Sequence, residues 1–195
     1  NHKWWGLDSY LESSSTIKIH NLSDSKFSQQ IVKETLDHLD FSEYFSSPTQ
    51  YLQVIADELI SNSLYKGPSK KRSELGYPDQ DRKSPAFLKG AELVQVTFGM
   101  DSQCVALSVQ DSFGTLSFET LINSLERSFR EKTVMDKKDG AGLGLYMTYL
   151  HGSQFIVNLR PHFRTEVISI IEKNKRYKTY KQRVRSFHFY EEVVK

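Results

Sequence analysis

The sequence has little of what marks several specialised classes of protein. It contains one cysteine, Cys104, so no disulfide can form within the chain, and we expect this thiol to be buried rather than reactive. No stretch approaches the roughly 20 apolar residues that cross a bilayer, and the N-terminus lacks a basic segment followed by an apolar core. These absences favour a soluble, cytoplasmic protein without a membrane partner.

A strong net charge is also absent. The chain has 26 basic and 24 acidic residues, a formal net charge of +2, which argues against nucleic acid as the main partner. Basic runs at residues 66–72 and 173–185 are typical of solvated surfaces. The length of 195 residues suits one domain with a core of its own. Because the chain opens with Asn1 rather than methionine, we allow that it is part of a longer protein.

The spacing of apolar residues predicts alternating strands and helices. Strands are expected at residues 16–22, 92–98, 103–110, 154–160, 165–171 and 184–190, with a tight turn at 99–102. Helices are expected from a cap at Asp24 or Ser25 to about Leu39, over 49–65 with a stop at Gly67 and Pro68, over 117–130 and over 145–150. Residues 67–90 are interpreted as a long polar loop or insertion. These elements divide the chain into an arm (1–15), a domain (16–171) and a basic C-terminal extension (172–195) that adds a strand or hairpin.

The first candidate motif lies on the helix expected at residues 49–65. Glu58 and Asn62 are four residues apart, so they share one face of that helix and both have apolar neighbours. A carboxylate and an amide so placed can bind a cation and orient a water or hydroxyl, as phosphoryl transfer requires. The pair is also compatible with a solvent-facing Glu and a helix-end Asn.

The second motif is the segment Asp111-Ser112-Phe113-Gly114, which directly follows an apolar strand. An Asp at a strand end can point a fixed acceptor into a pocket, where it suits the exocyclic amine of adenine. Taken alone, the segment is equally typical of an ordinary turn.

The third motif is the glycine run from Gly140 to Gly144, which opens a helix. Its backbone amides can surround anionic oxygens at the positive end of that helix, so we expect phosphates there. No Gly-Lys-Ser/Thr follows, so it is not a Walker loop, and its spacing and the preceding strand do not fit a Rossmann fingerprint.

In this order, the three motifs resemble the N, G1 and G2 boxes of the histidine-kinase-like (GHKL) ATPase superfamily, over about residues 22–171. The resemblance implies an α+β fold, a two-layer sandwich whose mixed, mostly antiparallel sheet has helices on one face and can leave the other face open. It also implies ATP or ADP and Mg²⁺ as ligands, with a lid over residues 115–139.

Each motif residue takes a role from that resemblance. Asn62 would ligate Mg²⁺, Glu58 would act as the catalytic base, and Asp111 would accept the adenine amine. Gly114 would let the backbone pass close to the base, and Thr165 would fix adenine through water. The phosphates would be held by the glycine run and a lid lysine, which are Gly140, Ala141, Gly142, Leu143, Gly144, Leu145 and Lys138.

The resemblance is nearest to the branch of bacterial anti-sigma factors and serine kinases. That branch implies a protein partner, a sigma factor or an anti-anti-sigma protein that is phosphorylated on Ser or Thr, and it is compatible with a homodimer. An alternative is the catalytic domain of a histidine kinase with a response-regulator-type partner, although His20 and His38 lack the pattern of a phosphoacceptor helix. A second alternative is a binding module gated by nucleotide without turnover.

Overall fold

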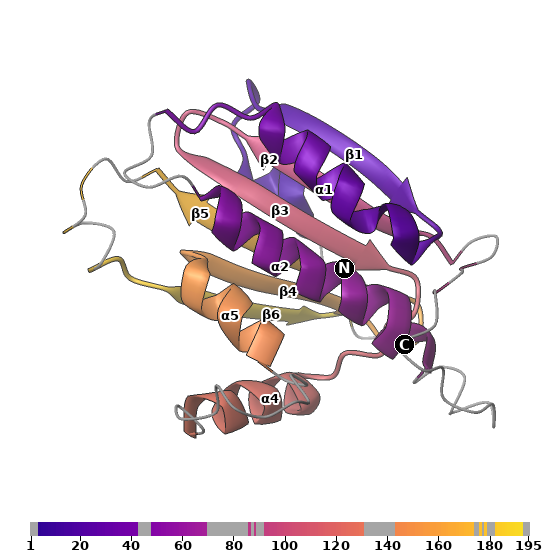
Figure 1. Cartoon of the computed structure of the whole chain (residues 1–195). Helices are drawn as coiled ribbons and strands as arrows, with labels where there is room; N and C mark the ends of the chain where they lie inside the picture. The colour runs from indigo at the N-terminus through magenta and orange to yellow at the C-terminus, as the bar shows by residue number, and fades with distance from the viewer. Residues whose placement is uncertain are drawn as a thin grey trace.

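Six strands form one sheet in the order β1-β2-β3-β5-β4-β6 (Figure 1). The strands are β1 (Thr16–Leu22), β2 (Val94–Met100), β3 (Cys104–Asp111), β4 (Gln154–Arg160), β5 (Arg164–Glu172) and β6 (Ser186–Glu191). Neighbouring strands are antiparallel except β4 and β6, which run parallel. The computed structural model describes residues 4–42, 48–69, 86, 88, 92–130, 143–173, 176, 178 and 182–192.

Helices cover one face of this sheet. They are α1 (Ser28–Asp37), α2 (Thr49–Ser61), α4 (Phe118–Arg130) and α5 (Leu143–His151), with short turns η1 (Leu7–Tyr10), η2 (Ser25–Phe27) and η3 (Asn62–Lys66). In Figure 1, α1, α2 and α5 lie side by side over the sheet, and α4 lies beyond α5. The arrangement confirms the predicted class, an α+β two-layer sandwich with a mixed, mostly antiparallel sheet and helices on one face.

Alternation along the strands builds a core on both faces of the sheet. In β3, Val105, Leu107 and Val109 face the helices and join the larger apolar cluster, whereas Cys104 and Ala106 face the opposite side. Burial raises the pKa of the Cys104 thiol to about 12, so this cysteine is a buried, unreactive core residue, as predicted.

The face that the sequence suggested could be open is covered in part by the N-terminal arm. Leu7 is buried against the sheet and forms a second apolar cluster with residues of β3, β4 and β5, and Tyr10 and Leu11 pack against that cluster. The arm crosses Gly99 so closely that a Cβ there would lie 2.3 Å from Leu11 Cδ1. The arm thus adds an apolar layer that periodicity did not reveal over β3, β4 and β5, whereas Ile17 and Ile19 of β1 remain 41% and 57% exposed.

Two predicted boundaries also need correction. The turn between β2 and β3 is at residues 101–103 rather than 99–102, and the Asp101 carboxylate accepts from the N–H groups of Gln103 (2.7 Å) and Cys104 (2.8 Å). Gly67 does not stop the second helix, since helical structure continues through residue 69. A Cβ at Gly67 would lie 2.7 Å from a ring carbon of Phe113, so packing explains this glycine.

The remaining helices and strands lie close to their predicted positions. Asp24 caps the turn before α1 by accepting from the Lys26 N–H, and His20 contacts Thr35 of α1 in a 2.9 Å hydrogen bond. One strand of the predicted C-terminal extension is present as β6, whereas most of the predicted insertion at 67–90 lies outside the described residues. Within the described part of the chain, every helix is too short or too polar to cross a bilayer.

Candidate functional site

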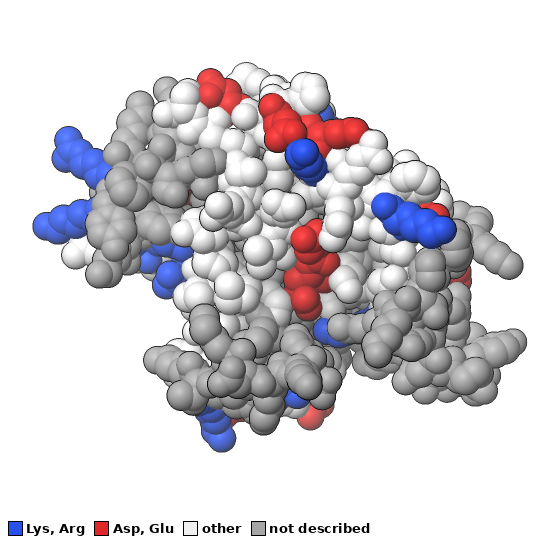
Figure 2. All heavy atoms as spheres, in the orientation of Figure 1, with Lys and Arg blue, Asp and Glu red and all other residues white. Residues whose placement is uncertain are grey.

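The predicted motifs meet where α2, the end of β3 and the start of α5 come together. Glu58 of α2 contacts Gly144 of α5, and Ser63, which follows Asn62, contacts Asp111 of β3. Figure 2 shows acidic side chains exposed over α2, in the middle of the helix-covered face. Residues far apart in the sequence thus form one continuous cluster.

Glu58 and Asn62 are joined by a part-buried hydrogen bond on the side of α2 that faces α5. Asn62 Nδ2 donates to Glu58 Oε1 at 2.9 Å, which fixes the orientation of the amide. The other amide atom, Asn62 Oδ1, is buried and has no hydrogen-bond partner among the described residues. An unpaired buried acceptor is costly, so this oxygen is suited to a cation or a donor that is not part of the protein.

Lys66 belongs to the same cluster, and the sequence reasoning missed it. Its Nζ lies 3.8 Å from Glu58 Oε1, and the two side chains are 43% and 22% exposed. In a regular α-helix, eight residues leave a side chain roughly 80° around the axis from its starting point. The π turn over Asn62–Lys66, closed by a bond from the Gly67 N–H to the Asn62 carbonyl, rotates less per residue and brings Lys66 back toward Glu58.

Gly144 places the first turn of α5 directly against Glu58. A Cβ at this position would lie 1.7 Å from Glu58 Cδ and 1.8 Å from Cγ, so any side chain would displace the carboxylate. The N-terminus of a helix carries partial positive charge, which favours the nearby anionic side chain. Glycine therefore lets the two helices approach closely while Glu58 keeps its position.

Asp111 ends β3 with its side chain turned inward. Its Oδ1 accepts from the Phe113 N–H at 2.9 Å and the Gly114 N–H at 3.4 Å, and its Oδ2 accepts from the Ser63 hydroxyl at 3.4 Å. The residue is 8% exposed. Oδ1 is thus held by two backbone donors, and the contact of Oδ2 with the Ser63 hydroxyl is long.

Burial shapes the acidity of this carboxyl group. Desolvation raises the pKa of Asp111 from its usual 3.8 to about 6, and the N–H groups of Phe113, Gly114 and Thr165 with the Ser63 hydroxyl act in the opposite direction. The group is ionised at neutral pH at a cost in folding free energy. An additional donor at Oδ2 would reduce that cost.

Thr165 lies opposite Asp111 in the β3–β5 register, so the two side chains share the helix-covered face of the sheet. Thr165 is 3% exposed, and its Oγ1 has no hydrogen-bond partner among the described residues. A carboxylate oxygen with a weak contact and an unpaired hydroxyl are therefore neighbours. A ligand that carries an amine, or a water beside it, can satisfy both.

Gly114 is required by the protein's own backbone. It has a φ of +62°, and a Cβ would lie 2.4 Å from the Arg160 carbonyl oxygen and 2.5 Å from the Phe163 nitrogen. The Gly114 carbonyl accepts from the His162 N–H at 3.0 Å. The close approach seen here is to the β4–β5 turn, which holds the Asp111 turn in place.

Only part of the glycine run lies among the described residues. Gly140, Ala141, Gly142 and Lys138 lie outside the described residues, and α5 begins at Leu143. Leu145 is 7% exposed and packs in the core, so only its backbone can contact a ligand. Much of the predicted lid is α4, which packs against α5 through the buried Leu121.

The C-terminal extension holds the opposite end of α5. Arg183 Nη2 donates to the carbonyls of Leu150 (2.9 Å) and His151 (3.2 Å), and Arg185 Nε donates to Leu150 (3.0 Å). Cations at a helix C-terminus satisfy its terminal carbonyls and its dipole. Glu58 and these arginines thus fix α5 at its two ends.

Comparison with known proteins adds no family to this picture. No family model matches the chain, and no curated protein matches it. We therefore infer the function of the chain from its residues and their geometry.

Proposed function

We propose that this cluster binds ATP or ADP with Mg²⁺ and that the chain is the nucleotide-binding domain of a GHKL-type protein kinase. The observation that carries the proposal is the proximity of the three motifs: Gly144 lies against Glu58, and Ser63, the residue after Asn62, contacts Asp111. Coincidental motifs have no reason to touch, whereas parts of one binding site must.

The adenine end of the site is formed by Asp111 and Thr165. The Asp111 carboxylate accepts a hydrogen bond from the exocyclic amine of adenine at Oδ2, the oxygen that makes the long 3.4 Å contact with Ser63. Thr165 supplies the hydroxyl for a bridging water, which would satisfy its unpaired oxygen. The site should discriminate between adenine and a base that lacks this amine, because such a base leaves Asp111 Oδ2 without that donor.

The metal end is formed by Asn62. Its Oδ1 is a hard oxygen donor that has no partner in the described part of the chain, and Mg²⁺ takes a small number of such ligands beside phosphate oxygens and water. Bound there, Mg²⁺ would neutralise phosphate charge. Glu58 orients the amide through the 2.9 Å bond to Nδ2, and Lys66 adds a cation beside the same carboxylate.

Glu58 is the proposed base for transfer to a serine or threonine of a partner protein. The partner hydroxyl oxygen forms a bond to the γ-phosphorus as the bond from that phosphorus to the β–γ bridging oxygen breaks, ADP leaves, and Glu58 takes the hydroxyl proton. A sigma factor or anti-anti-sigma protein is the kind of partner this proposal implies. Transfer to histidine would instead place the chain with the response-regulator systems.

Calorimetry tests the binding step. We expect wild-type protein to bind ATP with micromolar affinity in the presence of Mg²⁺, and Asn62→Ala to lose most of the metal dependence while it still binds the nucleoside part. Gln53→Ala, an exposed change on the same helix, is the matched control and should bind as wild type. Failure of wild type to bind any adenine nucleotide would refute the proposal.

Turnover separates a kinase from a nucleotide-gated module. Glu58→Gln keeps the hydrogen bond from Asn62 but cannot accept the substrate proton, so it should bind ATP normally and transfer phosphate about 100-fold more slowly or less. The measurement is transfer of labelled γ-phosphate to a candidate partner. Equal rates for wild type and Glu58→Gln would remove Glu58 from catalysis.

A further inference from the structure

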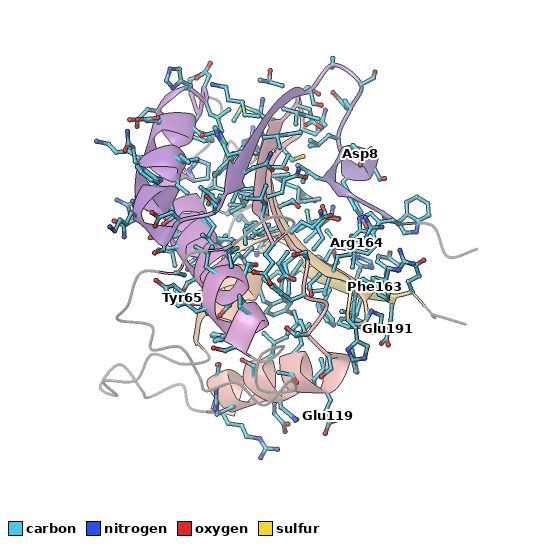
Figure 3. All side chains as sticks on the ribbon, turned by 90° about the vertical axis from the view of Figure 1, so that its right-hand side faces the viewer. Asp8, Tyr65, Glu119, Phe163, Arg164 and Glu191 are labelled. Carbon is cyan, nitrogen blue, oxygen red and sulfur yellow. The ribbon has the colours of Figure 1, made fainter. Side chains whose placement is uncertain are left out.

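A second pocket lies on the other side of the sheet, between the N-terminal arm and the end of β6. It has a volume of about 240 Å³. Its lining comprises Trp4, Trp5, Asn158, Leu159, Phe189, Tyr190, Glu191 and Glu192. Figure 3 shows Phe163, Arg164 and Glu191 on the side of the sheet opposite Tyr65, so this pocket is separate from the candidate nucleotide site.

The charged side chains that line this pocket are both acidic. Glu192 Oε2 lies 3.6 Å from Arg160 Nε, so its charge is partly compensated. The ion pairs among the described residues do not include Glu191, whose backbone pairs with β4 opposite Leu159. The pocket therefore presents one uncompensated carboxylate beside aromatic rings, which favours a cationic ligand.

The aromatic residues of the pocket are suited to a cation as well. The guanidinium carbon of Arg164 lies 3.5 Å from the centroid of the Trp4 ring and occupies one face of this indole, so a ligand cation must use the other aromatic surface of the pocket. Trp5, which is 39% exposed, and Tyr190, which is 40% exposed, add further accessible aromatic surface. Rings combined with a carboxylate are a common way to bind an organic ammonium group.

The side chain of Asn158 indicates which kind of cation fits the pocket. The residue is 1% exposed, and its Nδ2 donates to the Trp5 carbonyl (2.7 Å) and to Glu166 (3.2 Å). These two acceptors fix the amide orientation and leave Oδ1, which has no partner among the described residues, as an acceptor at the pocket wall. A ligand with N–H donors can satisfy this oxygen, whereas a quaternary ammonium cannot.

We propose that this pocket binds a primary or secondary alkylammonium group, supplied either by a free polyamine or by a lysine side chain of another protein. The ammonium lies against the indole rings, pairs with Glu191 and donates toward Asn158. This inference does not depend on nucleotide binding. It assigns a ligand to a site built from the arm and β6, two segments at opposite ends of the chain.

Tryptophan fluorescence tests the proposal, because the chain contains only 2 tryptophans and both line the pocket. Putrescine, spermidine and an Nα-acetyl-lysine amide are titrated into the wild-type chain. We expect saturable fluorescence changes with at least one of these amines. Binding of the lysine derivative alone identifies a protein partner as the source, and binding of the polyamines alone identifies a free amine.

Two comparisons make the test specific. Glu191→Gln should weaken amine binding about threefold to tenfold, the effect of losing one accessible charge, whereas Asp37→Asn, which removes an exposed carboxylate from α1, should leave it unchanged. Choline should bind at least threefold more weakly than spermidine. The proposal is overturned if no amine gives a saturable change, if both variants behave alike, or if choline binds as well as spermidine.

Discussion

Thr165 and Glu166 are adjacent in β5 and face opposite sides of the sheet, and their hydrogen bonding differs completely. Glu166 is 5% exposed and accepts from Ser108 (2.7 Å), Trp4 (2.9 Å) and Asn158 (3.2 Å). Thr165 is equally buried, yet its hydroxyl has no partner among the described residues. The two residues are similarly buried and differ in the hydrogen bonds of their side chains.

The comparison distinguishes buried polar groups that stabilise the fold from buried polar groups that are suited to bind a ligand. A satisfied group such as Glu166 stabilises the native state, so its removal should be destabilising. An unpaired group such as Thr165 or Asn62 Oδ1 costs folding free energy and gains only on binding. Removal of a paired group should therefore lower stability, and removal of an unpaired group should mainly weaken ligand binding.

The largest expected effect is that of Glu166→Ala. The variant leaves three donors without their acceptor, so we expect the free energy of unfolding to fall by about 2–4 kcal/mol. Denaturant unfolding measures the change, with the exposed Glu119→Ala on α4 as the control. Nucleotide affinity of the folded variant should stay near the wild-type value. Unchanged stability would contradict the structural role of Glu166.

The next effect is the pH dependence introduced by Asp111. Its folded-state pKa is raised, so the protonated form stabilises the fold fully below the usual pKa of 3.8, and this contribution is lost as the pH rises through about 6. Asp111→Asn, which cannot ionise, should therefore be more stable than wild type by about 1–3 kcal/mol at pH 7. The gap should close near pH 4. A gap that is independent of pH would show that burial does not penalise this carboxylate.

A smaller effect is expected for Gly144→Ala. The new methyl group overlaps Glu58, so the carboxylate must move and stability should fall by about 1–2 kcal/mol. Glu58→Ala in the same chain removes the overlap and should restore stability without restoring phosphoryl transfer. Chemical denaturation of the single and double variants gives the coupling free energy. Additive effects would mean that the two residues do not touch.

The smallest effect compares two buried threonines. Thr165→Val removes an unpaired hydroxyl and should change stability by less than about 0.5 kcal/mol, while ATP affinity falls about threefold to tenfold. Thr35→Val removes a hydroxyl that bonds His20 (2.9 Å) and the Ile31 carbonyl (2.8 Å), so it should cost about 1 kcal/mol or more and leave affinity unchanged. Equal stability losses would erase the distinction between paired and unpaired groups.

Local patterns predicted the elements of this fold well because their periods survive in the structure. The alternation at residues 16–22 reappears as β1, and the helical spacing of Leu52, Ile55 and Leu59 reappears as the buried face of α2. The proximity within the pairs Glu58–Asn62 and Asp111–Gly114 could also be predicted from the sequence. The first pair lies within about one helical turn and the second within one tight turn.

Long-range and aperiodic features could not be read in the same way. The arm is joined to the sheet by contacts such as Trp4 with Glu166, which are 162 residues apart, and no local period signals them. Lys66 was missed because a regular helix turns it away from Glu58, and the π turn that realigns it has no sequence signature. The reason for Gly114 was visible only once the β4–β5 turn lay against it.

Asp111 is expected to lower folding stability at neutral pH and to contribute to nucleotide binding in return. One measurement addresses both effects: the thermal unfolding midpoint of wild type and Asp111→Asn at pH 7, with and without excess ATP and Mg²⁺. We expect Asp111→Asn to have the higher unfolding midpoint without ligand. We expect nucleotide to raise the midpoint of the wild type alone. An equal nucleotide-induced shift in both proteins would contradict this expectation.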